Sequence, residues 1–314
     1  MPRNTVIIRR MEHDNRTMGI VCVGAAHNDR IARCQAEFVR RASNPVTVTS
    51  SHGGVARNVA LNLARLGQRV KLVSVLGADK QGEAIAEELA AAGIDLVDVE
   101  HIAARTTASY TAVLDTEGEL LCGLADADIY DLLDAARLKA LAPRLTTWPL
   151  WAIDANLPEA GIGALATAAP DGVHLAALAV SPAKAPRLAS HLSRFEMLFA
   201  NRAEAAALLE ERVETAAEAL AAGDTLRALG PKLVFVTLGE EGVAVATQEA
   251  CEIYPAPACA LVNVNGAGDA FAAGVMAAHL AGASLAPAVE HGLAAASLTA
   301  SAPDTCSAEL SALV

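Results

Sequence analysis

A glycine-rich turn followed by an aspartate is the stretch of this sequence whose residues could most directly do chemistry. Gly266, Ala267, Gly268 and Asp269 stand before an alanine-rich apolar run that reaches about Leu280. Glycines at a helix start let backbone N–H groups approach an anion, and the free amides of the first turn point at it. A carboxylate beside such an anion site suits a general base that accepts a proton from a hydroxyl. The pattern is typical of a phosphoryl-transfer half-site, with a capping aspartate as the alternative interpretation.

A second glycine motif lies far earlier in the chain. Gly53 and Gly54 precede a predicted helix over 55–66 that carries Asn58. Together, the two motifs resemble the C-terminal and N-terminal signatures of the PfkB, or ribokinase-like, family of carbohydrate and nucleoside kinases. The resemblance extends from about residue 19 to about residue 300 and assigns Gly53, Gly54 and Asn58 to substrate binding. Without it, Asn58 is an ordinary amide on a helix surface.

The elements that must position these motifs follow from hydrophobic periodicity and from the resemblance. Apolar runs predict strands at 19–24, 70–77, 150–157 and 174–180, and the segment 234–243 is predicted to be a strand, a glycine turn and the start of a second strand. Helical spacing predicts helices at 55–66, 79–92 and 289–299. The resemblance implies an α/β fold, a ribokinase-like three-layer α/β/α domain over 19–314 with a mostly parallel central sheet. Polar strand-like segments at about 31–51 and 103–124 are expected to form its small β-lid, with a hairpin turn at 115–118. Residues 1–18 are expected to be an N-terminal extension without a secretory signal.

Polar residues that follow two predicted strands are the candidates for substrate binding. The resemblance implies that Asp29 binds a sugar hydroxyl, with His27 where the family usually has Asn. A carboxylate suits this task because it accepts two hydroxyl hydrogen bonds at once. On its own, Asp29 is an ordinary solvated loop residue. Asp154 and Asn156 stand at the carboxyl end of a predicted parallel strand, where ligands collect, and are expected in the same pocket.

The nucleotide half of the site is expected from weaker signals. Asn201 and Glu204 match the family's Asn-x-x-Glu motif, and their oxygens suit the waters of a hydrated Mg²⁺ ion beside the phosphates of ATP. A helix cap with a surface glutamate is the alternative. The turn that carries Thr237, Gly239 and Gly242 is expected to face ATP, although a simple hairpin explains the same residues.

One further loop departs from the family pattern. Relatives commonly carry Asp-Pro where this chain has Leu178-Ala179, so a polar contact is expected to be missing there. Lys184, shortly afterwards, is expected to reach a phosphate.

Composition excludes several classes of function. The formal net charge of −12 argues against a nucleic-acid or anionic-membrane partner, because either would favour a basic surface. Six cysteines without metal-site spacing are expected to be reduced, buried thiols, which fits a cytoplasmic protein. No uninterrupted apolar run reaches the roughly 18 residues of a membrane span. Neither a P-loop lysine motif nor a G-x-G-x-x-G after the first strand is present, which argues against P-loop kinases and dehydrogenases.

Within the family, several segments resemble the bacterial pseudouridine kinases: 43–45, 107–115, 153–156 and Asn263. This implies transfer of phosphate from ATP to the 5′-hydroxyl of the nucleoside, with Asp269 as base, Mg²⁺ as cofactor and a homodimer through the β-lid. Asn263 lies where the family's monovalent-cation loop starts, which leaves a K⁺ requirement open. The alternatives are a ribokinase, a fructokinase, a purine nucleoside kinase, and a nucleoside-binding protein without catalysis.

Overall fold

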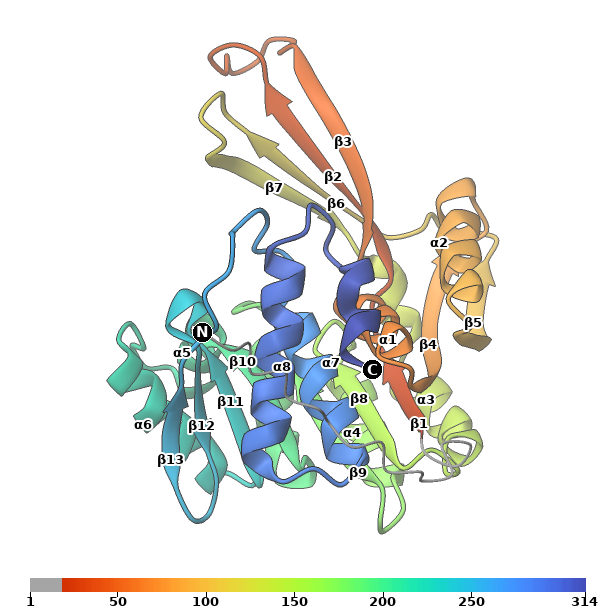
Figure 1. The fold of residues 1–314 in the computed structure, drawn as a ribbon. Helices are drawn as coiled ribbons and strands as arrows, with labels where there is room; N and C mark the ends of the chain where they lie inside the picture. The colour runs from red at the N-terminus through yellow and green to blue at the C-terminus, as the bar shows by residue number, and fades with distance from the viewer. Residues whose placement is uncertain (1–18) are drawn as a thin grey trace.

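In the computed structural model, which describes residues 19–314, a nine-stranded sheet runs between two layers of helices (Figure 1). The expected extension over 1–18 lies outside the described residues. Seven neighbouring strands run parallel, and two further strands pair antiparallel at one edge of the sheet. The prediction of a mostly parallel sheet is therefore confirmed. The strand order is β13 (Cys251–Tyr254), β12 (Val243–Ala246), β11 (Leu233–Thr237), β10 (Met197–Asn201), β9 (His174–Leu178), β8 (Leu150–Asp154), β1 (Gly19–Val23), β4 (Arg69–Gly77) and β5 (Asp95–Ile102).

Helices cover both faces of this sheet, as the three-layer prediction requires. Alternate residues of β1 show the division, because Ile20 and Cys22 enter one core while Val21 and Val23 enter the other. One face packs against α1 (Val55–Arg65), α2 (Lys80–Ala91), α7 (Ala267–Leu280) and α8 (Leu285–Ala300). The other packs against α3 (Ala135–Leu141), α4 (Glu159–Ala168), η3 (Ala185–Arg194), α5 (Arg202–Leu209) and α6 (Ala216–Ala228). Short 3₁₀ turns are η1 (Asp128–Leu132), η2 (Ala142–Arg144), η4 (Gly239–Glu241) and η5 (Ala308–Leu313).

A separate four-stranded sheet projects from the body and forms the expected lid (Figure 1). Its order is β3 (Val46–Gly53), β2 (His27–Cys34), β6 (Ser109–Leu114) and β7 (Leu120–Asp126). The predicted turn is confirmed, since the Asp115 carboxylate accepts the amides of Gly118 and Glu119, each at 2.8 Å. The lid starts earlier than predicted, because His27 and its neighbours already pair with β3.

Asp79 fixes the base of the lid to the body. Its carboxylate caps α2 by accepting the amide of Gly82 at 2.8 Å. It also accepts the amide and the hydroxyl of Thr107, both at 2.7 Å, just before β6 begins. One side chain therefore holds both a helix start and the entry to the lid.

Charged residues explain why β5 escaped prediction. Lys71 of β4 is buried, and its ammonium lies 2.8 Å from Asp95 and 2.7 Å from Asp98 on β5. Arg144 reaches Asp98 from the other side, at 2.7 Å. Ion pairs hold this edge strand to its neighbour, so its sequence lacks the apolar run that marks the inner strands.

The cysteines agree only in part with the sequence-based expectation. All six are free thiols, and Cys22, Cys34 and Cys306 are buried. Cys122 on the lid and Cys259 after β13 are exposed, so the expectation that every cysteine is buried is wrong. Among residues 19–314, no helix combines the length and apolar character needed to cross a bilayer.

Candidate active site

Helix α7 begins at Gly266, in a backbone conformation that favours glycine. Gly266 has a φ of 81°, and a Cβ atom there would lie 2.0 Å from the backbone oxygen of Thr305. The first hydrogen bond of the helix runs from the Ala270 amide to the Gly266 oxygen, at 2.9 Å. The predicted glycine-bounded helix start is confirmed, and the C-terminal segment, for which no role was predicted, closes against it.

The first turn of α7 leaves room for an anion at Gly268. A Cβ atom there would meet no protein atom within 4 Å, unlike one at Gly266. Amides in a first helical turn have no partner within the helix, although that of Ala267 makes a long 3.4 Å bond to the Val264 oxygen. The exposed turn and the positive end of the helix dipole favour negative charge at this place.

An aromatic cluster holds α7 against the sheet just after Asp269. The ring of Phe271 packs edge-on against Phe235 of β11, with centroids 5.8 Å apart, and against Phe199 of β10 at 6.1 Å. The rings of Phe199 and Phe235 stack on each other at 4.8 Å. These contacts fix the helix turn that carries Asp269.

Asp269 lies in the first turn of α7 and bonds to Asn58 of α1. The Asn58 side-chain amide donates to an Asp269 carboxylate oxygen at 2.8 Å. Burial raises the pKa of Asp269 to about 7, against the lowering effect of the Asn58 hydrogen bond. The carboxylates of Asp154 and Glu204 raise it further. A carboxyl group that titrates near neutral pH is matched to general-base catalysis.

Arg57 and its partners form a network behind this pair that sequence reasoning missed. The buried Arg57 guanidinium donates to the Asn58 oxygen at 2.9 Å and to the Glu88 carboxylate. Glu88 also contacts a His52 ring nitrogen at 2.7 Å. Because Arg57 occupies the oxygen of Asn58, the amide nitrogen is left to face Asp269. An arginine inside the apolar helix motif of 55–66 was the available signal.

Two cavities flank the network on the α2 side of the lid. One of about 350 Å³ is lined by His52, Arg57, Glu88 and Asp304, among others. The other, of about 460 Å³, lies between lid strands and the start of α2. The predicted catalytic residues line neither cavity.

The predicted substrate residues of the lid come together around Gly53. A Cβ atom on Gly53 would lie 1.9 Å from an Asp29 carboxylate oxygen, so the two strands meet closely there. The His27 ring nitrogen lies 3.1 Å from the other Asp29 oxygen. Gly54 has a φ of 100°, and a Cβ there would lie 2.4 Å from the Ala25 oxygen. The di-glycine therefore joins the lid, the end of β1 and the start of α1.

Asp154, a predicted substrate-binding residue, is surrounded by hydrogen-bond donors of its own chain. Its side chain is fully buried at the end of β8 and accepts the amides of Ala25 at 2.9 Å and Ala56 at 3.0 Å. Burial also raises the pKa of Asp154. Asn156 is similarly buried, with its amide bonded to Asp154 and its oxygen accepting the Lys184 ammonium. Asp154, Asn156 and Lys184 are thus linked by hydrogen bonds at the carboxyl end of β8, an inner strand of the sheet.

Asn201 and Glu204 form a reciprocal cap at the start of α5. The Asn201 oxygen accepts the Glu204 amide at 2.9 Å, and the Glu204 carboxylate accepts the Asn201 backbone and side-chain N–H groups at 2.8 and 2.9 Å. Burial raises the pKa of Glu204. The helix cap of the alternative interpretation is therefore present, but Glu204 is buried and is not the surface glutamate that it expected. Since a carboxylate has about four acceptor positions, Glu204 retains capacity for water of a hydrated Mg²⁺ ion.

The predicted nucleotide turn lies beside this cap. Thr237 ends β11 directly opposite Asn201 of β10 in the parallel register. Gly239 has open space where a Cβ would be, whereas a Cβ on Gly242 would lie 2.0 Å from the Tyr254 oxygen. Gly239 is thus free to face a ligand, and Gly242 is required by the hairpin itself.

A strained turn follows β9, in the loop where a missing polar contact was predicted. Val180 has a φ of 71°, and the Ser181 amide donates to the Ala179 oxygen at 2.8 Å, which closes a three-residue turn. A β-branched residue in this conformation costs about 1–3 kcal/mol. The strained Val180 lies at the carboxyl end of β9, four positions before Lys184.

Comparisons with known proteins agree with this geometry. The family model for pfkB family carbohydrate kinases matches residues 18–312. The uncharacterized sugar kinase YeiI of Escherichia coli K12 is 28% identical, in an alignment that covers 89% of this chain and 77% of YeiI. Pseudouridine kinase of the same organism is 25% identical, in an alignment that covers 93% of each of the two chains. A solved carbohydrate kinase from Agrobacterium tumefaciens has a TM-score of 0.80 and 34% identity, covering 94% of this chain and 96% of its own. The Arabidopsis thaliana ribokinase solved with ribose and ATP shares the fold, with a TM-score of 0.83 and 22% identity over 94% of this chain and 98% of its own.

Gly266, the N-cap of α7, and Gly268 in its first turn offer a matched pair of substitutions. Gly268→Ala adds a methyl group to open space, so thermal stability should stay equal or rise slightly, because alanine favours a helix by up to about 1 kcal/mol. Its kcat/KM for ATP should fall by on the order of tenfold to a hundredfold, since the methyl group occupies the anion position. Gly266→Ala should instead lower the thermal midpoint, because it combines a positive φ with a clash. Unchanged ATP kinetics in Gly268→Ala would place the anion elsewhere.

The pKa of Asp269 predicts the pH dependence of activity. A base must be ionised, so kcat/KM should rise with pH through a midpoint of about 7 and be lost below it. Asn58→Ala removes a hydrogen bond that favours the charged form, so the midpoint should move to higher pH. Initial rates over a pH series, with circular dichroism as a check on folding, measure both. A midpoint near the ordinary aspartate value of 3.8 would contradict the assignment.

Proposed function

The chain belongs to the pfkB family of carbohydrate kinases, and from this we propose that it phosphorylates the 5′-hydroxyl of pseudouridine with ATP. The proposal depends above all on one observation: a carboxyl group with a pKa of about 7 lies beside a glycine-bounded helix start. The family phosphorylates hydroxyl groups of sugars or nucleosides, which is the chemistry this pair suits.

In the proposed reaction, Asp269 accepts the proton of the attacking hydroxyl. At the same time, the oxygen of that hydroxyl forms a bond to the γ-phosphorus. The bond from that phosphorus to the bridging oxygen of ADP breaks, and the electron pair leaves with ADP. Amides of Ala267 and Gly268 stabilise charge on the transferred group. Asn58, held by Arg57, keeps the Asp269 carboxylate in position.

The substrate half of the site is assigned to the lid and the di-glycine. Asp29 is placed to accept ribose hydroxyls, and the lack of side chains at Gly53 and Gly54 lets the backbone approach the sugar. Buried Asp154 holds Ala25 and Ala56 and so supports this half indirectly.

The nucleotide half is assigned to the ends of β10 and β11. We assign Thr237 and Gly239 to ATP because Thr237 pairs with Asn201 at the strand ends, and Lys184 is available to a phosphate if it leaves Asn156. Glu204 and Asn201 would hold Mg²⁺ through water, since their cap leaves carboxylate acceptor positions free. The ion neutralises charge on the phosphate oxygens when bound. The Asn263 side chain donates to the distant Pro303 oxygen and accepts the Asn265 amide of its own turn, so no K⁺ ligand is assigned to it.

The lid is also the proposed dimer surface. Several large apolar side chains are exposed on it, including Val48, Leu120, Leu121 and Leu124. Exposed edge strands with apolar residues favour pairing with a second copy.

Two observations favour pseudouridine over other acceptors. Several segments of the sequence resemble pseudouridine kinases, and the alignment with the Escherichia coli pseudouridine kinase covers 93% of both chains. The second candidate is a sugar, because a sugar kinase matches at comparable identity. Both candidates use the same base and the same anion site, so only a substrate panel separates them.

Replacing the base tests the mechanism. Asp269→Asn should lower kcat by on the order of a hundredfold or more, because the amide cannot take the proton. Affinity for ATP, measured by calorimetry, should stay nearly unchanged, since the backbone amides are intact. Turnover like that of the unmodified chain would refute the base assignment.

A panel of acceptors tests the substrate. ADP release should be measured with ATP and Mg²⁺ for pseudouridine, uridine, adenosine, ribose and fructose. We expect kcat/KM for pseudouridine to exceed that for uridine by at least about tenfold, since the two bases offer different hydrogen-bonding groups. Preference for ribose or fructose would retain the mechanism and select the sugar candidate, whereas ATP binding without any ADP release would contradict both.

A further inference from the structure

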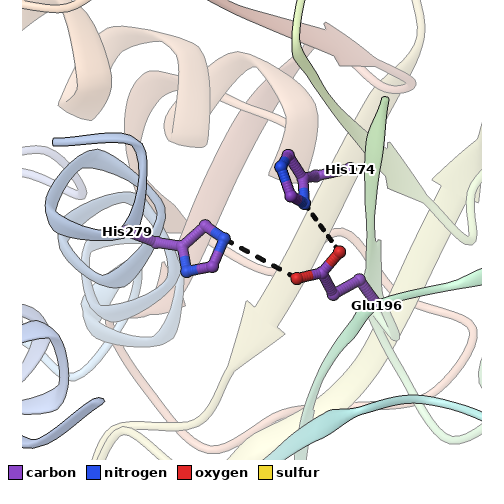
Figure 2. A group of neighbouring side chains, drawn as sticks. All are labelled: His174, Glu196 and His279. Carbon is purple, nitrogen blue, oxygen red and sulfur yellow. Dashed lines mark hydrogen bonds and ion pairs between the residues drawn. The ribbon is translucent and has the colours of Figure 1, made fainter. Parts of the chain in front are cut away.

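Two histidines and a glutamate converge at the end of the sheet opposite to Asp269 (Figure 2). His174 begins β9, Glu196 directly precedes β10, and His279 lies in the last turn of α7. A His174 ring nitrogen lies 2.6 Å from one Glu196 oxygen, and a His279 ring nitrogen lies 3.7 Å from the other. One ligand atom from each residue lies within 4.8 Å of the other two.

We propose that His174, Glu196 and His279 bind a divalent transition-metal ion of the Zn²⁺ type. Two imidazole nitrogens and one carboxylate oxygen are a common three-residue ligand set for such ions, with a fourth position left to water. Imidazole ligands disfavour Mg²⁺, which prefers oxygen, so this site differs in kind from the phosphate site.

The distances suit a metal after small side-chain movements. Ligand atoms about 2.0–2.2 Å from a tetrahedral ion lie roughly 3.4 Å from one another. The 3.7 Å separation of His279 and Glu196 is close to this value, and the 2.6 Å hydrogen bond between His174 and Glu196 would open to admit the ion. The three residues come from separate elements whose backbones the sheet and α7 already fix.

Exposure and charge also permit entry of an ion. The side chains of His174, His279 and Glu196 are 38%, 26% and 17% exposed, so water reaches the cluster. The C-terminal end of α7 adds partial negative charge beside His279. One group opposes binding: the Lys232 ammonium lies 3.6 Å from Glu196, but its side chain is 75% exposed and can turn into solvent.

The site would join three elements without entering the phosphoryl-transfer reaction. His279 lies ten residues after Asp269 on α7, which corresponds to about 15 Å along the helix axis. A bound ion would tie the far end of this helix to β9 and β10. Its expected effect is therefore greater stability of the folded chain, with basal kinase activity nearly unchanged.

Zn²⁺ binding to the full chain, measured by competition with a chromophoric chelator, tests the proposal. We expect one equivalent to bind and the thermal midpoint to rise. His174→Ala and His279→Ala should each weaken binding by at least about a hundredfold while keeping the metal-free thermal midpoint and kinase activity. His191→Ala, a histidine outside the cluster, is the matched control and should bind normally.

Lys232→Met separates a metal site from an ordinary polar cluster. Removing the competing ammonium should tighten Zn²⁺ binding severalfold, whereas loss of one ion pair from a merely structural cluster would leave metal affinity unchanged. Bound Co²⁺ should show the visible absorption of a tetrahedral nitrogen and oxygen site without a thiolate charge-transfer band, which excludes Cys122 and Cys259. Absence of saturable binding, or Zn²⁺ affinity in both histidine variants equal to that of the unmodified chain, would overturn the proposal.

Discussion

The buried carboxylate of Asp154 is the interaction on which the substrate end of the sheet depends. It accepts the backbone amides of Ala25, just after β1, and Ala56, at the start of α1. A buried charge is costly unless donors surround it, and charge-assisted hydrogen bonds offset that cost. Because Gly54 and Asn58 belong to the same helix start, these hydrogen bonds of Asp154 also help to position both residues.

Opposing influences set the pKa of Asp269 at about 7. Burial and the carboxylates of Asp154 and Glu204 favour its protonated form, whereas the Asn58 hydrogen bond and the charge of Arg57 favour the ionised form. None of these influences acts through a flexible surface group, because each partner is buried or nearly so. The preorganised surroundings, more than the aspartate itself, make this position suitable for proton transfer.

Strands β1, β4, β8, β9 and β11 were predictable because each is an apolar run, and helices α1 and α2 because their apolar residues recur at helical spacing, unlike β10 and the helices on the other face of the sheet. β5 was not, since charged contacts to Lys71 stabilise it. The motif residues of the site were also predictable. Their partners were not, because the bond between Asn58 and Asp269 joins residues 211 positions apart and leaves no local signal. The same holds for the histidine–glutamate cluster, whose members lie on three separate elements.

Thr305 and Cys306 complete the site from a distant part of the chain. The Thr305 oxygen closes on Gly266, and the Cys306 sulfur lies 3.8 Å from an Arg57 nitrogen that precedes it by 249 residues. During synthesis on the ribosome, the lid and α1 are therefore made long before the anion-binding turn gains its final support. A nascent chain stopped before residue 305 would contain every strand of both sheets and still lack that support. The contacts that support Gly266 and Arg57 therefore form only after residue 306 has been made.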